Sequence, residues 1–244
     1  MKRRMWISGT VLSFCLLAVS WATAEALVFS ADNGGGLAAS VTFEGSGTDL
    51  VVTLTNTSPA DVVNPTQVLS AVFFTLAGDP TLTPVSAMLT DGSTVVFGPT
   101  GGGNVSGEWA YREGLRGAPA GAHAGIAAAG LGLFGPADRF GTPNLAGPIS
   151  VGGLNYGITS AGDDLSTGNT PVTGKDALIQ NAVRFTLTGL PPSGLGDITN
   201  VSFQYGTSLA EPNVSPVPEP ATLVLLGSGL AALGGLAWRK RRRA

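Results

Sequence analysis

Hydrophobic and polar positions alternate over short segments along most of the chain, between two long apolar runs near its ends. The segments are rich in valine, threonine and phenylalanine and are bounded by turn-forming residues, which favours strands joined by tight turns. The predicted strands are residues 27–30, 37–44, 49–56, 67–76, 83–90, 94–97, 107–112, 182–188 and 198–205. Only residues 120–133 suit a short helix, and their four glycines weaken it. The pattern predicts a mainly β body, arranged as an antiparallel β-sandwich.

A glycine-rich region interrupts this regular pattern. Residues 113–174 are rich in glycine, alanine and proline and show little alternation. We expect them to form an ordered insertion over one end of the sandwich. The body then spans residues 27–210, and the composition of residues 211–217 predicts a linker to the C-terminal segment.

The N-terminal apolar run has the features of a secretory signal peptide. Lys2, Arg3 and Arg4 precede an apolar stretch over residues 5–21, and small residues flank two cleavage positions, the second ending at Ala26. We expect signal peptidase to cut after Ala26. Residues 1–26 would then be removed once the general secretion machinery has exported the body.

The C-terminal segment, residues 218–244, contains three parts in a fixed order. Pro218, Glu219 and Pro220 precede an uncharged apolar run over residues 221–238. As a helix this run would span about 27 Å, close to the thickness of a bilayer core. Five cations that resist translocation follow it: Arg239, Lys240, Arg241, Arg242 and Arg243. The order predicts a single C-terminal transmembrane helix with its basic end in the cytoplasm.

This tripartite segment resembles the PEP-CTERM sorting signal of exported bacterial proteins. The resemblance implies processing near Pro218, Glu219 and Pro220 by exosortase, a membrane-embedded protease-transpeptidase. It also implies transient anchoring in the inner membrane of an exopolysaccharide-producing bacterium, then placement at the cell surface or in the extracellular matrix. On the residues alone, a plain tail-anchored or type I membrane protein is the alternative.

The composition excludes several kinds of active site. The only cysteine, Cys15, lies in the predicted signal peptide, so the mature chain has no disulfide or thiol chemistry. The only histidine, His123, lies in a small-residue stretch, where we expect a solvated loop residue rather than a rigid catalytic base. We therefore expect a protein without enzymatic activity. A glycoside hydrolase that uses two acidic side chains is the remaining catalytic alternative.

The charge of the body argues against nucleic acid as a partner. Residues 27–218 contain five cationic and fourteen acidic side chains, a net charge of −9 that repels phosphate backbones. We expect no organic cofactor. Calcium is a candidate ligand of the loop that contains Asp163, Asp164 and Asn169, because paired carboxylates and an amide supply the oxygens that calcium prefers. The alternative is a turn that the same side chains cap.

Trp109 and Tyr111 are candidate sugar contacts. Two residues apart on a strand, they would share one face and could stack on a sugar ring, or they could pack together in the core. The sequence thus predicts a structural or interaction protein of the envelope or matrix. A carbohydrate-binding module that recognises exopolysaccharide is the alternative.

Overall fold

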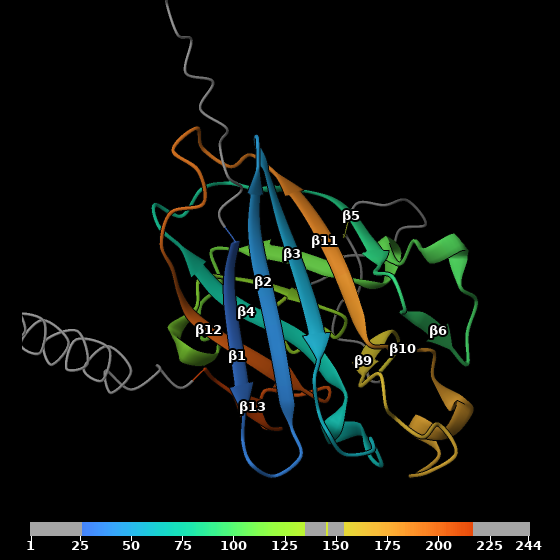
Figure 1. The fold of residues 1–244 in the computed structure, drawn as a ribbon. Coiled ribbons are helices and arrows are strands. Elements are labelled where there is room, and N and C mark those ends of the chain that lie inside the picture. The colour runs from blue at the N-terminus through green and yellow to red at the C-terminus, as the bar shows by residue number, and fades with distance from the viewer. Residues whose placement is uncertain (1–25, 135–144, 146–153, 217–244) are drawn as a thin grey trace, which may run out of the picture.

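Two β-sheets face each other in the computed structural model, which describes residues 26–134, 145 and 154–216 (Figure 1). The first sheet has the order β1-β2-β3-β11-β5, with bounds β1 Ala26–Asp32, β2 Ala38–Ser46, β3 Asp49–Asn56, β11 Ala182–Thr188 and β5 Thr83–Leu89. The second has the order β13-β12-β4-β9-β10-β6, with bounds β13 Asn213–Val214, β12 Ile198–Tyr205, β4 Leu69–Leu76, β9 Gly157–Thr159, β10 Leu178–Gln180 and β6 Thr94–Val96. β8 (Ala124–Ala127) pairs with β4 on one side and with β7 (Ala110–Glu113) on the other.

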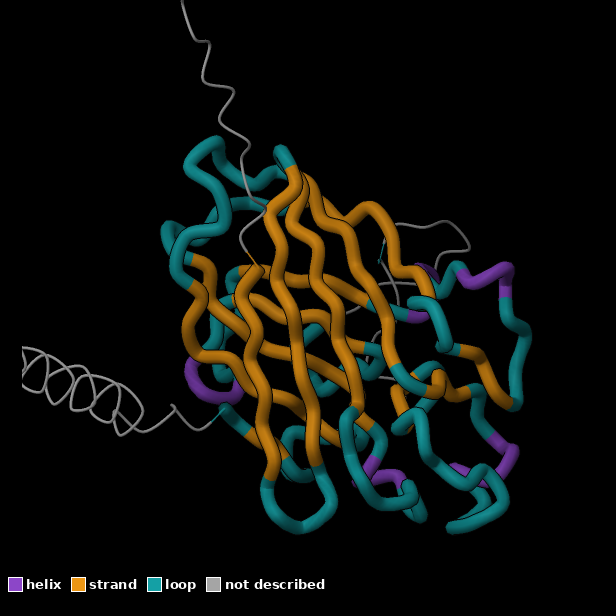
Figure 2. The backbone as a smooth tube through the Cα atoms, viewed as in Figure 1, coloured by secondary structure: helices purple, strands orange, loops and turns teal. Residues whose placement is uncertain are grey.

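Helical structure among the described residues is limited to short turns at the periphery (Figure 2). Their bounds are η1 Pro65–Gln67, η2 Gly101–Gly103, η3 Ser106–Glu108, η4 Pro119–Gly121 and η5 Pro171–Lys175. The prediction of a mainly β body is therefore confirmed.

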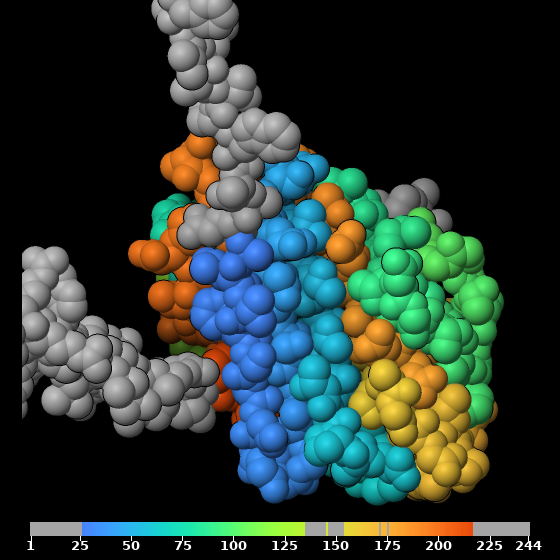
Figure 3. All heavy atoms as spheres, in the orientation of Figure 1, coloured from blue at the N-terminus to red at the C-terminus, as the bar shows by residue number. Residues whose placement is uncertain are grey.

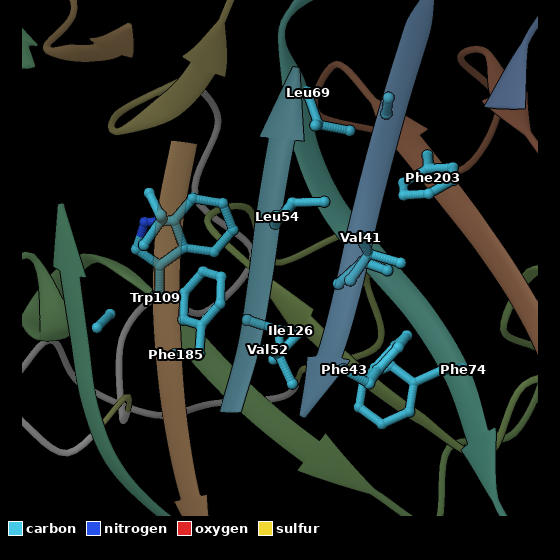
Figure 4. Close-up of a cluster of buried hydrophobic side chains, with 14 of the residues drawn as sticks. Val41, Phe43, Val52, Leu54, Leu69, Phe74, Trp109, Ile126, Phe185 and Phe203 are labelled. Atoms are coloured by element: carbon cyan, nitrogen blue, oxygen red, sulfur yellow. The ribbon is translucent and has the colours of Figure 1, made fainter. Parts of the chain in front are cut away.

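Alternation along β2 and β3 produces the first sheet's inner face. Phe43 is opposite Val52, and Val41 is opposite Leu54, and all four side chains are fully buried. The Phe43 ring meets Phe74 of β4 edge to face, with 5.0 Å between the ring centres (Figure 4). Apolar residues of both sheets thus form one core between the layers. The outward positions of the first sheet form the broad face that β1 to β3 present in Figure 3.

The glycine-rich region is placed differently from the prediction. Phe73 of β4 packs in a second buried cluster with Ala118, Ala122 and Leu131 of this region. The region therefore covers the outer side of β4, a position that the sequence did not predict. It also contributes β8 and β9 to the second sheet.

Two predictions of local structure are wrong. The short helix expected over residues 120–133 is replaced by η4 and strand β8. Gly125 of β8 lies so close to Phe73 that an added Cβ would come within 2.8 Å of the ring, and this close approach favours a strand of small residues. The sheets are also not purely antiparallel, because β9 and β10 pair in parallel.

The predicted linker over residues 211–217 is wrong in its first part. Asn213 and Val214 form β13, which pairs with β12, and the backbone N–H of Tyr205 donates to the carbonyl of Pro212 at 3.0 Å. The Gln204 amide nitrogen also donates to the carbonyl of Glu211 at 3.1 Å. These hydrogen bonds hold the segment in the sheet and extend the folded body beyond residue 210.

The predicted signal peptide, the transmembrane helix over residues 221–238 and the basic cluster 239–243 lie outside the described residues, except Ala26. Within the described part of the chain, no helix is long and apolar enough to cross a membrane.

Candidate functional site

A pocket of about 430 Å³ lies where three strands of the second sheet end. Glu113, the last residue of β7, is opposite Ala124, the first residue of β8, and Ala124 is opposite Phe74 of β4. Because β8 runs antiparallel to both neighbours, the ends of β4 and β7 meet the start of β8 at one edge. The pocket is therefore built by the strand register.

The side chains of His123 and Asp79 contact each other at the pocket. The Nδ1 atom of His123 lies 3.1 Å from both carboxylate oxygens of Asp79. Asp79 follows β4 in a turn where its φ is +43°, a left-handed conformation that aspartate tolerates better than most residues. The backbone of His123 is held as well, since its N–H donates to Thr75 and its carbonyl accepts from Leu115.

Tyr111 and Glu113 form a second polar pair. The Tyr111 hydroxyl donates to Oε2 of Glu113 at 3.3 Å, and the backbone N–H of Leu82 donates to the same oxygen at 3.1 Å. Burial raises the pKa of Tyr111 far above its usual value, and the negative charges of Glu113 and Asp79 raise it further. Tyr111 therefore remains a neutral hydrogen-bond donor at physiological pH.

Sequence reasoning missed this pocket. His123 was expected as a solvated loop residue, and its side chain is indeed 53% exposed, but it is anchored on both backbone and side chain. Asp79 and His123 are 44 residues apart, and only the pairing of β8 with β4 brings them together. A strand over residues 124–127 was the one sequence feature that could have indicated the pocket. Its small residues show no strand pattern.

The structure separates Trp109 from Tyr111 as candidate sugar contacts. Trp109 is fully buried, with its ring 4.9 Å from that of Phe185 in an edge contact (Figure 4). It presents no face to a ligand, which corrects the prediction of a stacking pair and favours the core-packing alternative. Tyr111 is only partly buried and lines the pocket.

The Asp163–Asp164 loop is tied to the segment that precedes η1. Asp163 is 8% exposed and accepts from the backbone N–H of Val62 at 2.8 Å, while Asp164 accepts from the hydroxyl of Ser166 at 2.7 Å. Asn169 contacts the same segment through its backbone, whose N–H donates to the carbonyl of Val63. In the described part of the chain, no three acidic, histidine or cysteine side chains converge as a metal site would require. Calcium binding by this loop stays a prediction.

Burial and hydrogen bonding shift the pKa values of the Asp163 and Asp164 carboxyl groups in opposite directions. Burial raises the pKa of Asp163 above its ordinary value, against the hydrogen bond from Val62. Hydrogen bonds from Ser166 lower the pKa of Asp164, which is exposed.

The last strand of the described residues, β13, is followed by a sequence motif of a known family. The model of the PEP-CTERM protein-sorting motif matches residues 216–243. The chain carries a PEP-CTERM sorting motif. No curated protein and no solved structure matches the chain.

The PEP-CTERM motif confirms the resemblance found in the sequence. It implies that the protein is exported, held transiently in a membrane and processed with exosortase as its partner. The motif begins two residues after Val214, so the sorting segment follows directly from an edge strand of the second sheet.

Proposed function

We propose that this protein is a non-enzymatic structural or interaction component of the cell surface or extracellular matrix of an exopolysaccharide-producing bacterium. The PEP-CTERM motif at residues 216–243 carries the proposal, because it joins a folded β body to a sorting segment. A β-sandwich body that exosortase releases from its membrane helix suits a role outside the cell.

The arrangement around His123 supports a non-catalytic role. Its imidazole contacts a carboxylate, but no serine or threonine hydroxyl of the described residues hydrogen-bonds to the ring. Tyr111 stays protonated, so it is a poor nucleophile or base.

The test is the intact mass and the location of the protein in a cell that contains exosortase. We expect loss of the residues up to Ala26 and of the segment after the Pro218–Pro220 element, with the product at the surface or in the matrix. Alanine at Pro218, Glu219 and Pro220 should leave the C-terminal segment attached. The matched control, alanine at Pro191 and Pro192 in the loop after β11, should be processed normally.

A wild-type protein that keeps residues 221–244 at the membrane would contradict the proposal and support a plain membrane protein. Hydrolysis of a polysaccharide by the purified protein would contradict the non-enzymatic role.

A further inference from the structure

The pocket at the ends of β4 and β7 has a donor and acceptor pattern that the sorting function does not use. Asp79 and Glu113 supply carboxylate oxygens, and each already accepts from a protein donor: His123 in one case, Tyr111 and Leu82 in the other. An ionised carboxylate has room for about four hydrogen bonds. Both groups are thus held in position and keep lone pairs for further donors.

Arg116 supplies hydrogen-bond donors, which complement the carboxylate acceptors of Asp79 and Glu113. Its side chain is exposed at the pocket and makes no ion pair with any other described residue. A guanidinium has five N–H donors in a fixed plane, so it can bind ligand oxygens without first breaking a contact in the protein.

Charges of both signs line the pocket. The carboxylates of Asp79 and Glu113 share it with the guanidinium of Arg116 and the imidazole of His123. A ligand with a strong net charge gains little in such a site, whereas a neutral molecule with many hydroxyl groups can both donate and accept.

Apolar surface completes the lining. Leu76, Pro80 and Leu115 line the pocket together with Tyr111. An apolar wall with a few fixed polar groups is the usual composition of a small-molecule site, and the cavity volume lies within the usual range. Such a wall suits the C–H face of a sugar ring, whose hydroxyl groups point to its edges.

From this geometry we propose that the pocket of Asp79, Tyr111, Glu113, Arg116 and His123 binds a neutral saccharide unit. The proposal deepens the proposed function, on which it rests for the source of the ligand, an exopolysaccharide chain. It moves recognition from the buried Trp109 to a pocket in which Arg116 and the two carboxylates select the hydroxyl pattern.

The experiment uses the full chain with its C-terminal segment, purified in a zwitterionic detergent that contains no sugar. Isothermal titration measures binding of short oligomers of glucose, galactose, mannose and N-acetylglucosamine, with a uronic acid oligomer as the charged comparison. We expect at least one neutral oligomer to bind. Arg116→Gln should weaken that binding about tenfold or more, because a hydrogen bond to a charged group is lost.

Two variants serve as controls. Arg184→Gln removes an exposed arginine from β11 on the first sheet and should leave affinity unchanged. Trp109→Phe keeps an aromatic core residue and should also bind normally as long as its melting curve shows a folded protein.

Several results would overturn the proposal. One is that the folded protein binds none of the neutral oligomers, and another is that it binds the uronic acid oligomer alone. The third is that Arg116→Gln and Arg184→Gln bind with equal affinity. The binding measurements do not depend on processing, and the intact mass in native cells does not depend on the pocket. A negative result for the saccharide site therefore leaves the test of the proposed function interpretable, and the reverse also holds.

Discussion

Among single residues, Trp109 shows best how burial decides a role that sequence leaves open. A tryptophan near a tyrosine suits core packing more often than sugar stacking, and only its position between the two sheets decides which role it has. Its indole is fully buried against Phe185, and its Nε1 atom has no partner among the described residues.

We predict that Trp109 is a stability residue. Trp109→Ala should lower the free energy of unfolding by about 3–5 kcal/mol, the usual cost of emptying a large aromatic site. Trp109→Phe should cost much less, because it keeps the contact with Phe185 and removes an unpaired N–H. Urea unfolding followed by circular dichroism measures both, and an Ala variant as stable as the wild type would contradict the buried position.

At the same scale, Asp163 and Asp164 should respond to pH in opposite ways. The pKa of Asp163 is raised in the folded state, so its stabilising effect is complete below its ordinary value of 3.8 and is lost as pH rises through the folded value. Relative to Asp163→Asn, the wild type should therefore lose melting temperature as pH increases. Asn keeps an acceptor for Val62 without the buried charge.

Asp164→Asn is the matched comparison. The pKa of Asp164 is lowered, so its contribution is present above the ordinary value and is lost as pH falls. Thermal melts of the three proteins between about pH 3 and pH 7 test both signs. Parallel curves for Asp163→Asn and the wild type would show that burial does not affect this carboxyl group.

At the scale of elements, the sequence predicts long alternating strands well and short strands of small residues poorly. β2 alternates over six positions and β3 over eight, between clear turn residues, so their bounds follow closely from the pattern. β8 and β9 consist of four and three residues, mostly Ala, Gly and Ile, which contain no readable period. Their strand conformation comes from pairing, of β8 with β4 and β7 and of β9 with β10 and β4, rather than from local preference.

Strand β8 gives a prediction in which packing and propensity disagree. Valine favours strands, yet Gly125→Val should destabilise the protein by about 1–3 kcal/mol, because the new side chain would meet the ring of Phe73. Thr42→Val, on the outward side of β2, should change stability by no more than about 0.5 kcal/mol. Comparison of their unfolding midpoints is the test, and a Gly125→Val protein as stable as the control would contradict the close packing.

For the whole molecule, the sequence predicted the sorting segment but not the pocket. A sorting motif is contiguous, so Pro218 to Arg243 can be recognised without any knowledge of the fold. The pocket joins Asp79, Glu113 and His123 from three strand ends, and no local pattern connects these positions. The extent of the body was misjudged for the same reason, because the pairing of β13 with β12 is not visible in the composition of residues 211–216.

The position of β13 therefore predicts where the folded body ends. A chain of residues 26–216 should unfold cooperatively, while a chain of residues 26–210 should be less stable by about 2–4 kcal/mol, because it loses several hydrogen bonds and the packing of Val214. The bonds include those from Tyr205 to Pro212 and from Ser208 to the Glu211 carboxylate. Glu211→Gln in the longer chain is the control for a single contact and should lie between the two. Equal unfolding midpoints for the two chains would return residues 211–216 to the role of a linker and place the start of the sorting segment further from the sheet.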